Sequence, residues 1–208
     1  MKKVIFEEDS VVQHDTDIDA FVPPHPGWNY VSITNHPKDK YIYERDVCGK
    51  WLIFVPTEEF VWAFRELAKL AKSLRLTHSF KASGRPAENG EHVFCVYCGN
   101  SSKTSFVRQI ADTLTDEGFL DKYGFQYRNG TKALFYKTDT ATHYKSQARG
   151  MSLTLYRFTD KKELFVKEFN DGTPNWRLVT SDENPSIMDS FNMHLSSLEM
   201  DRSMDYDD

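Results

Sequence analysis

The sequence feature that most constrains the fold lies near residue 56, where the pattern of hydrophobic residues changes from one typical of a strand to one typical of a helix. Residues 50–55 read KWLIFV, and this β-branched and aromatic run, bounded by Gly49 and Pro56, predicts a strand. The apolar positions that follow lie three and four residues apart, which is typical of one face of a helix. They are Phe60, Phe64, Leu67, Ala71 and Leu74. The chain is therefore expected to pass from a strand directly into an amphipathic helix, with Thr57 as its N-cap.

The rest of the chain repeats this mixture of strands and helices. Further strands are predicted at about residues 76–82, 92–97, 132–137, 151–158 and 164–169, and a second helix at 104–117. Asn89-Gly90 is a strong turn signal, and Asn129-Gly130 leaves open whether residues 125–137 form a hairpin or contribute one strand. This order predicts an α+β fold, with a curved, mostly antiparallel sheet and helices packed on one face.

Three segments are expected along the chain. Residues 1–27 predict an irregular arm, because the run PPHPG at 23–27 cannot lie inside a helix or a central strand. Residues 28–180 predict a single domain, and residues 181–208 an acidic, disordered tail. Residues 182–208 hold eight acidic residues against one basic residue, whereas the whole chain has a net charge of −5. The remainder is thus slightly basic, so the acidic average does not exclude an anionic ligand.

Composition narrows the class of protein. No apolar run approaches the roughly 20 residues that a membrane span needs, so no membrane partner is expected. Three cysteines, Cys48, Cys95 and Cys98, favour a reducing compartment, the cytoplasm or the nucleus. Positions 95 and 98 are three apart on a predicted strand and so face opposite sides, which argues against a metal or redox pair. No cofactor and no metal are predicted.

Strand alternation selects a set of basic side chains. On the predicted strands, Lys50, Lys81 and Lys137 lie at or near strand ends, and Tyr97 occupies the corresponding place on another strand. The loops add further cations. The candidate phosphate-binding residues are Lys50, Lys81, Arg85, Tyr97, Lys137, Lys145 and Arg149. Convergence of these groups would make an anion site, because lysine and arginine form charge-assisted hydrogen bonds with phosphate.

Residues 47–158 resemble the basophilic leukaemia-expressed protein family, whose fold resembles that of the mRNA cap-binding translation initiation factor. The resemblance rests on GKWLIF at 49–54, a tryptophan in the next helix, FKA at 80–82, VFCVY at 93–97 and FYKTD at 135–139. The factor also has an Asp-Thr-Ala-Thr segment like residues 139–142. The resemblance implies that Lys81, Arg85 and Lys145 face phosphates. For the two tryptophans that stack on the methylated guanine, the chain offers only Trp28.

A second resemblance is to the phosphothreonine lyase effectors of enteric bacteria, in which basic side chains and a tyrosine surround one phosphate. The matching positions, in chain order, are Lys50, Lys81, Arg85, Tyr97, Lys137 and Arg149. The resemblance implies that Lys81 is the catalytic base. The histidine that acts as general acid falls at Leu52, and leucine cannot transfer a proton.

Three functions are compatible with these patterns. The leading hypothesis is a non-catalytic domain that binds a phosphate-bearing ligand, namely a nucleotide, an RNA or a phosphopeptide. The alternative is a phosphothreonine lyase-like enzyme that works by β-elimination, with Lys81 as base and His143 or Tyr97 as acid. The third is a protein-interaction module that keeps only the fold. The sequence does not predict the oligomeric state.

Overall fold

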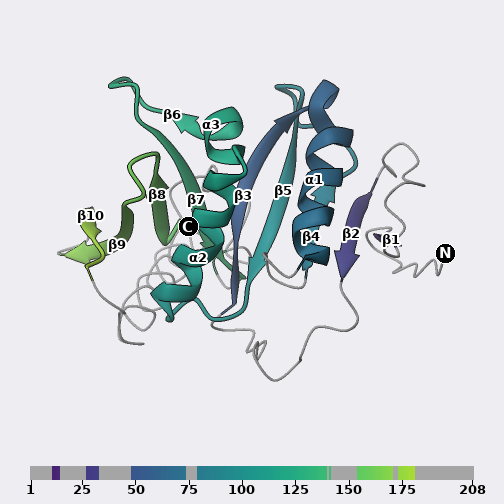
Figure 1. Cartoon of the computed structure of the whole chain (residues 1–208). Helices are drawn as coiled ribbons and strands as arrows, with labels where there is room; N and C mark the ends of the chain where they lie inside the picture. Colours follow the sequence, from purple (N-terminus) through teal and green to yellow (C-terminus); the bar gives the residue numbers. More distant parts are fainter. Residues whose placement is uncertain are drawn as a thin grey trace, which may run out of the picture.

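The structure is a computed structural model (Figure 1). It describes residues 11–14, 27–32, 48–73, 79–139, 141, 154–170 and 173–180. The predicted acidic tail at 181–208 and most of the predicted N-terminal arm lie outside these residues, as do Lys145 and Arg149. No helix in the described residues is long and apolar enough to cross a membrane.

Ten strands of the described chain form one sheet. They are β1 (Val11–His14), β2 (Trp28–Ser32), β3 (Gly49–Pro56), β4 (Ser79–Ser83), β5 (Glu91–Cys98), β6 (Phe125–Gln126), β7 (Lys132–Thr138), β8 (Tyr156–Thr159), β9 (Leu164–Asn170) and β10 (Thr173–Leu178). The order across the sheet is β1-β2-β4-β5-β3-β7-β8-β9-β10, with β6 paired to β7. Every pairing is antiparallel except that of β1 with β2.

The described helices lie together on one face of the sheet, as Figure 1 shows. They are α1 (Phe60–Lys72), α2 (Thr104–Asp116) and the short α3 (Phe119–Tyr123), and a 3-10 turn, η3 (Thr57–Glu59), precedes α1. The prediction of an α+β fold with an open, curved, mostly antiparallel sheet and helices on one face is confirmed for this part of the chain. The opposite face of the sheet carries no described helix, and we call it the open face.

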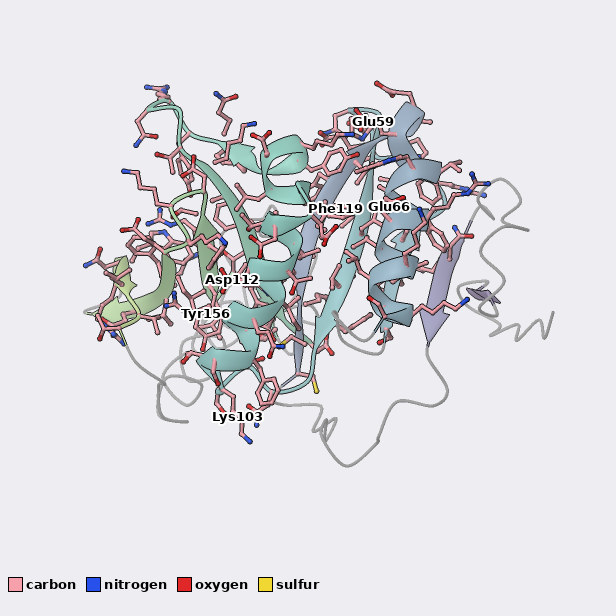
Figure 2. The ribbon with its side chains drawn as sticks, viewed as in Figure 1. Glu59, Glu66, Lys103, Asp112, Phe119 and Tyr156 are labelled. Carbon is pink, nitrogen blue, oxygen red and sulfur yellow. The ribbon has the colours of Figure 1, made fainter. Side chains whose placement is uncertain are left out.

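The core lies between the sheet and the helices. On β3 the side chains of Trp51, Ile53 and Val55 are fully buried on the helix side, and the indole of Trp51 donates a hydrogen bond to the carbonyl of Val107 on α2 at 3.1 Å. The predicted stripe of α1 is buried from residue 60 to residue 71, and position 74 lies outside the described residues. Figure 2 shows Phe119 between α3 and α1, and its ring is 5.8 Å from that of Trp62.

The predicted cap of α1 is wrong. The Thr57 hydroxyl donates a hydrogen bond to the carbonyl of Gly90 at 2.9 Å, and the helix begins three residues later, after the 3-10 turn. The cause is non-local: β5 pairs with β3 as far as Pro56, opposite Glu91, which brings the carbonyl of Gly90 next to Thr57. The Thr57 hydroxyl therefore bonds to a carbonyl that is distant in sequence, whereas the local sequence predicts that it caps the N-terminus of the helix.

Three other differences concern strands. The open question at 125–137 is answered by a hairpin, since β6 pairs antiparallel with β7 across a turn in which Gly130 has a φ of 86°. One more strand, which was not predicted, follows the one at 164–169: β10 folds back onto β9. Residues 11–14, within the arm expected to be irregular, form β1 and extend the sheet edge.

Candidate functional site

Four of the predicted site residues lie on the open face of adjacent strands. Lys50 on β3 is the cross-strand partner of Tyr97 on β5 and of Lys137 on β7. Because neighbouring strands are about 4.8 Å apart, these three side chains form one row across about 10 Å of sheet. Lys81 on β4 is opposite Cys95, one row away on the same face. We call Lys50, Lys81, Tyr97 and Lys137 the lysine cluster.

Cys95 lies close to the three lysines, because Lys81 is its cross-strand partner and Lys50 and Lys137 lie one row away. Burial raises the pKa of the Cys95 thiol. The charges of Lys81, Lys50 and Lys137 act on that thiol in the opposite direction, so all three ammonium groups lie within electrostatic reach of one point. Cys98, three residues on, is in the core on the helix side, where burial raises its pKa to about 12. The two cysteines therefore face opposite sides, as predicted.

Lys50 and Lys137 differ in how their charges are compensated. Lys50 is only 6% exposed, and its Nζ lies 2.6 Å from Oδ1 of Asp139. Lys137 is half-buried and forms no ion pair with any carboxylate of the described chain. Burial lowers the pKa of Lys137, and the charge of Lys50 lowers it further. A nearby anion would stabilise the charged form of Lys137.

Lys81 lies against an aromatic ring. Its Nζ is 4.0 Å from the ring centroid of Trp28 on β2, the strand next to β4. An ammonium over an indole face is a favourable cation–π contact. The Nζ of Lys50 likewise lies 5.7 Å from the ring of Tyr97. The cluster thus combines cations with aromatic planes, and it is bordered by Trp28, which the sequence offered only as a stacking partner and not as a neighbour of Lys81.

Arg85 does not join the cluster. It is exposed, in the loop between β4 and β5, beyond the end of β4 at Ser83. Tyr97 and Lys50 lie at the other end of the paired strands, so the structure does not bring Arg85 together with them, and its role in phosphate binding stays a prediction. The sheet keeps them apart, because an antiparallel hairpin places its loop at one end of both strands.

A second group of residues on the open face was not predicted as a site. Arg157 on β8 is the cross-strand partner of Phe135 on β7 and of Phe165 on β9. Its guanidinium carbon lies 4.4 Å from the ring centroid of Phe165, 4.9 Å from that of Trp176 and 5.7 Å from that of Tyr127. The alternation of side chains along the predicted strand 151–158 assigns Arg157 to one face of the sheet. The strand order that brings the aromatic rings around Arg157 cannot be predicted from sequence.

Lys167 on β9 borders this group, and its burial is expected to lower the free energy of unfolding. It is 6% exposed, with its Nζ 4.9 Å from the ring centroid of Trp176, and burial lowers its pKa to about 8. Because the folded state binds its proton less well than the unfolded state, the cost of the buried charge is largest below pH 8. We expect Lys167→Met to raise the free energy of unfolding at pH 7 by about 2 kcal/mol.

The pH dependence distinguishes this cause from better packing. The wild type gains stability between pH 8 and the ordinary lysine pKa, since the unfolded chain binds more protons there. The advantage of Lys167→Met, measured by chemical denaturation, is therefore expected to shrink across that range. An advantage that stays constant from pH 7 to pH 10.5 would show that charge burial is not the reason.

No protein-family model matches the chain, and no curated protein is similar enough to it to count as a match. The function is therefore inferred from the geometry of the open face. Within the described residues, no group of three or more histidine, cysteine, aspartate or glutamate side chains is placed to hold a metal ion.

Proposed function

We propose that the open face binds a phosphate-bearing ligand, a nucleotide or an RNA, with Lys81, Lys137 and Tyr97 in contact with it. The observation that carries the proposal is the convergence of three lysines on adjacent strands, with Asp139 paired to Lys50. Such a fixed cationic surface is suited to phosphate oxygens, which accept charge-assisted hydrogen bonds from ammonium groups. We further propose that the fold is of the cap-binding-factor type and that the protein acts in the cytoplasm or the nucleus.

The exposure of the residues supports distinct roles for them. Lys81, Lys137 and Tyr97 are partly exposed, so a ligand can reach them, whereas Lys50 is buried and acts through its charge. Bound phosphate would offset the repulsion between Lys50 and Lys137 that lowers the pKa of Lys137. The binding free energy would then come mainly from relief of this repulsion and from contacts with the partly exposed ammonium groups of Lys81 and Lys137.

The surroundings of Lys81 favour binding over β-elimination. A general base must give up its proton before the reaction, but the contact between Lys81 Nζ and the Trp28 ring stabilises the protonated form. Leu52, at the position of the general acid in the lyase effectors, lies on the same face between Cys95 and Phe135 as their cross-strand partner. These contacts support a binding role for the cluster.

The proposal is tested by removing the charges of the two partly exposed lysines of the cluster. We expect Lys81→Met combined with Lys137→Met to weaken binding of the best ligand at least about 30-fold, since each lost charge-assisted hydrogen bond costs about 1–2 kcal/mol. Nucleotides, cap analogues, oligoribonucleotides and phosphopeptides would be screened by thermal shift. A ligand at 100 times its dissociation constant should stabilise the wild type by about 2.7 kcal/mol.

A matched control removes the same charge from the other face. Lys69→Met with Lys72→Met takes two exposed lysines from α1 and is expected to leave binding unchanged. Equal affinity of the cluster variant and the wild type, with the fold intact, would refute the proposal. Dehydrated threonine in phosphopeptides incubated with the protein, detected by mass spectrometry, would instead support the lyase alternative.

A further inference from the structure

A hollow opens on the open face beside the arginine that lies among aromatic rings. Its volume is about 250 Å³. It lies over β8, the start of β9 and the turn between β6 and β7, and it is lined by Tyr127, Asn129, Thr131, Arg157, Thr159, Lys161, Glu163 and Phe165. Its wall combines flat rings and a planar guanidinium with hydroxyl and amide groups. No residue of the lysine cluster is among them.

Two buried side-chain atoms of residues that line the hollow have no hydrogen-bond partner within the described part of the chain. They are Nε of Arg157 and Oγ1 of Thr159, two residues apart on the same face of β8. Thr159 is only 4% exposed. More than nine in ten buried polar groups in proteins are paired, so an unpaired donor beside an unpaired hydroxyl indicates a place where a further group belongs. That group must present acceptors, because Nε of arginine can only donate.

The hollow and the lysine cluster lie on the same face, close enough for one ligand to reach both. Lys50 lies on β3, and Arg157 lies two strands away, on β8, and one row further along the sheet. Two strand spacings across the sheet and two residues along it amount to about 12 Å, a distance that a short extended single strand of nucleic acid can cover. Phe135, on the intervening β7, is the cross-strand partner of both Leu52 and Arg157. The surface between the two places is therefore largely apolar.

Resting on the proposed function, we propose that this hollow holds an unpaired base of a single-stranded nucleic acid whose phosphates lie on the lysine cluster. Unstacked bases bind proteins by stacking on aromatic rings or arginine planes and by hydrogen bonds along their edges. Tyr127, Phe165 and Arg157 supply the planes, and Thr159 and Thr131 supply edge partners. Base carbonyl and ring nitrogen atoms are the acceptors that Nε of Arg157 requires, and the hydroxyl of Thr159 can donate to such an atom or accept from a base amino group.

The experiment separates the base from the phosphates. The full chain is titrated, by fluorescence anisotropy, into a labelled oligouridylate of about ten nucleotides and into an abasic oligomer of the same length. The first variant is Arg157→Lys, which keeps the charge and loses the plane. The second is Thr159→Val, which keeps the shape and loses the hydroxyl. Arg108→Lys on α2, whose guanidinium binds the carbonyl of Val179, is the matched control.

We expect the wild type to bind the intact oligomer about tenfold more tightly than the abasic one, and Arg157→Lys to remove most of that difference. Its affinity for the abasic oligomer should not change, and Arg108→Lys should behave as the wild type. If Arg157→Lys fails to fold, Thr159→Val and the abasic comparison decide the question on their own, with a partial loss expected for Thr159→Val.

The outcomes also separate this inference from the proposed function. Equal affinity of the wild type for both oligomers, lost when Lys81 and Lys137 are replaced, would overturn the base site and leave the phosphate site standing. Binding of neither oligomer, but of a phosphopeptide, would overturn the nucleic-acid ligand and leave the lysine cluster as a phosphate site. No binding of any phosphate-bearing ligand would overturn both proposals.

Discussion

Gly49→Ala is expected to lower the free energy of unfolding by about 3 kcal/mol. A Cβ at this position would lie 2.5 Å from the hydroxyl oxygen of Tyr136 and 2.7 Å from the carbonyl oxygen of Lys137. The carbonyl belongs to β7, the strand paired with β3, and the Tyr136 ring is fully buried with its hydroxyl bonded to that of Ser101. Neither can move without opening the sheet or the core.

The steric cause can be separated from the general cost of replacing a glycine. Gly90 has a φ of 81°, and a Cβ there would meet no atom within 4 Å. Gly90→Ala is therefore expected to lower the free energy of unfolding by about 1 kcal/mol, which is the cost of placing alanine in the left-handed backbone region. Chemical denaturation of both variants would compare the two costs. A loss at position 49 no greater than that at position 90 would show that β3 and β7 separate easily at this end.

The same clash has a functional consequence. Gly49 precedes Lys50, and Lys137 is the cross-strand partner of Lys50. If β3 and β7 part near Gly49, the two ammonium groups no longer share one row, and the cluster loses its shape. Gly49→Ala is thus expected to weaken ligand binding beyond its effect on stability. The comparison is made at a temperature where the variant is still folded.

Much of the cluster could be predicted from sequence because strand alternation is local. Once residues 50–55, 92–97 and 132–137 are read as strands, the pleat alone assigns Lys50, Tyr97 and Lys137 to faces. The row they form depends on register, which is set by pairing between segments up to about 90 residues apart and is not written in any one segment. The sequence therefore predicted the members of the cluster better than their positions.

The residues that were missed depend on strand order. Trp28 joins Lys81 only because β2 pairs with β4, and Trp176 reaches Arg157 only because β10 folds back onto β9. Neither neighbour relation follows from hydrophobic period or turn chemistry. Arg85 lies apart from the cluster for the complementary reason: the chain leaves the sheet after Ser83, and the loop carries Arg85 to the end of the strands opposite Lys50 and Tyr97.

A substitution at Asp139 gives the sharpest test of whether the lysine cluster binds an anion. Its carboxylate lies 2.6 Å from Nζ of Lys50, whose side chain is 7% exposed. We expect Asp139→Asn to lower the free energy of unfolding by about 3 kcal/mol without ligand, because it leaves a buried ammonium without its counter-charge. The same change should raise affinity for the phosphate-bearing ligand about tenfold, since a phosphate would then supply the missing negative charge.

Damage to the fold does not easily produce opposite changes in stability and affinity. A misfolded variant loses both stability and affinity, whereas removal of a competing carboxylate lowers the stability and raises the affinity. Lys50→Met combined with Asp139→Asn removes the buried charge together with its partner, so it should regain most of the lost stability without the gain in affinity. Denaturation and anisotropy on Asp139→Asn, on Lys50→Met alone and on the double variant complete the cycle. Weaker ligand binding by Asp139→Asn would mean that Asp139 orders the cluster rather than competing with the ligand for Lys50.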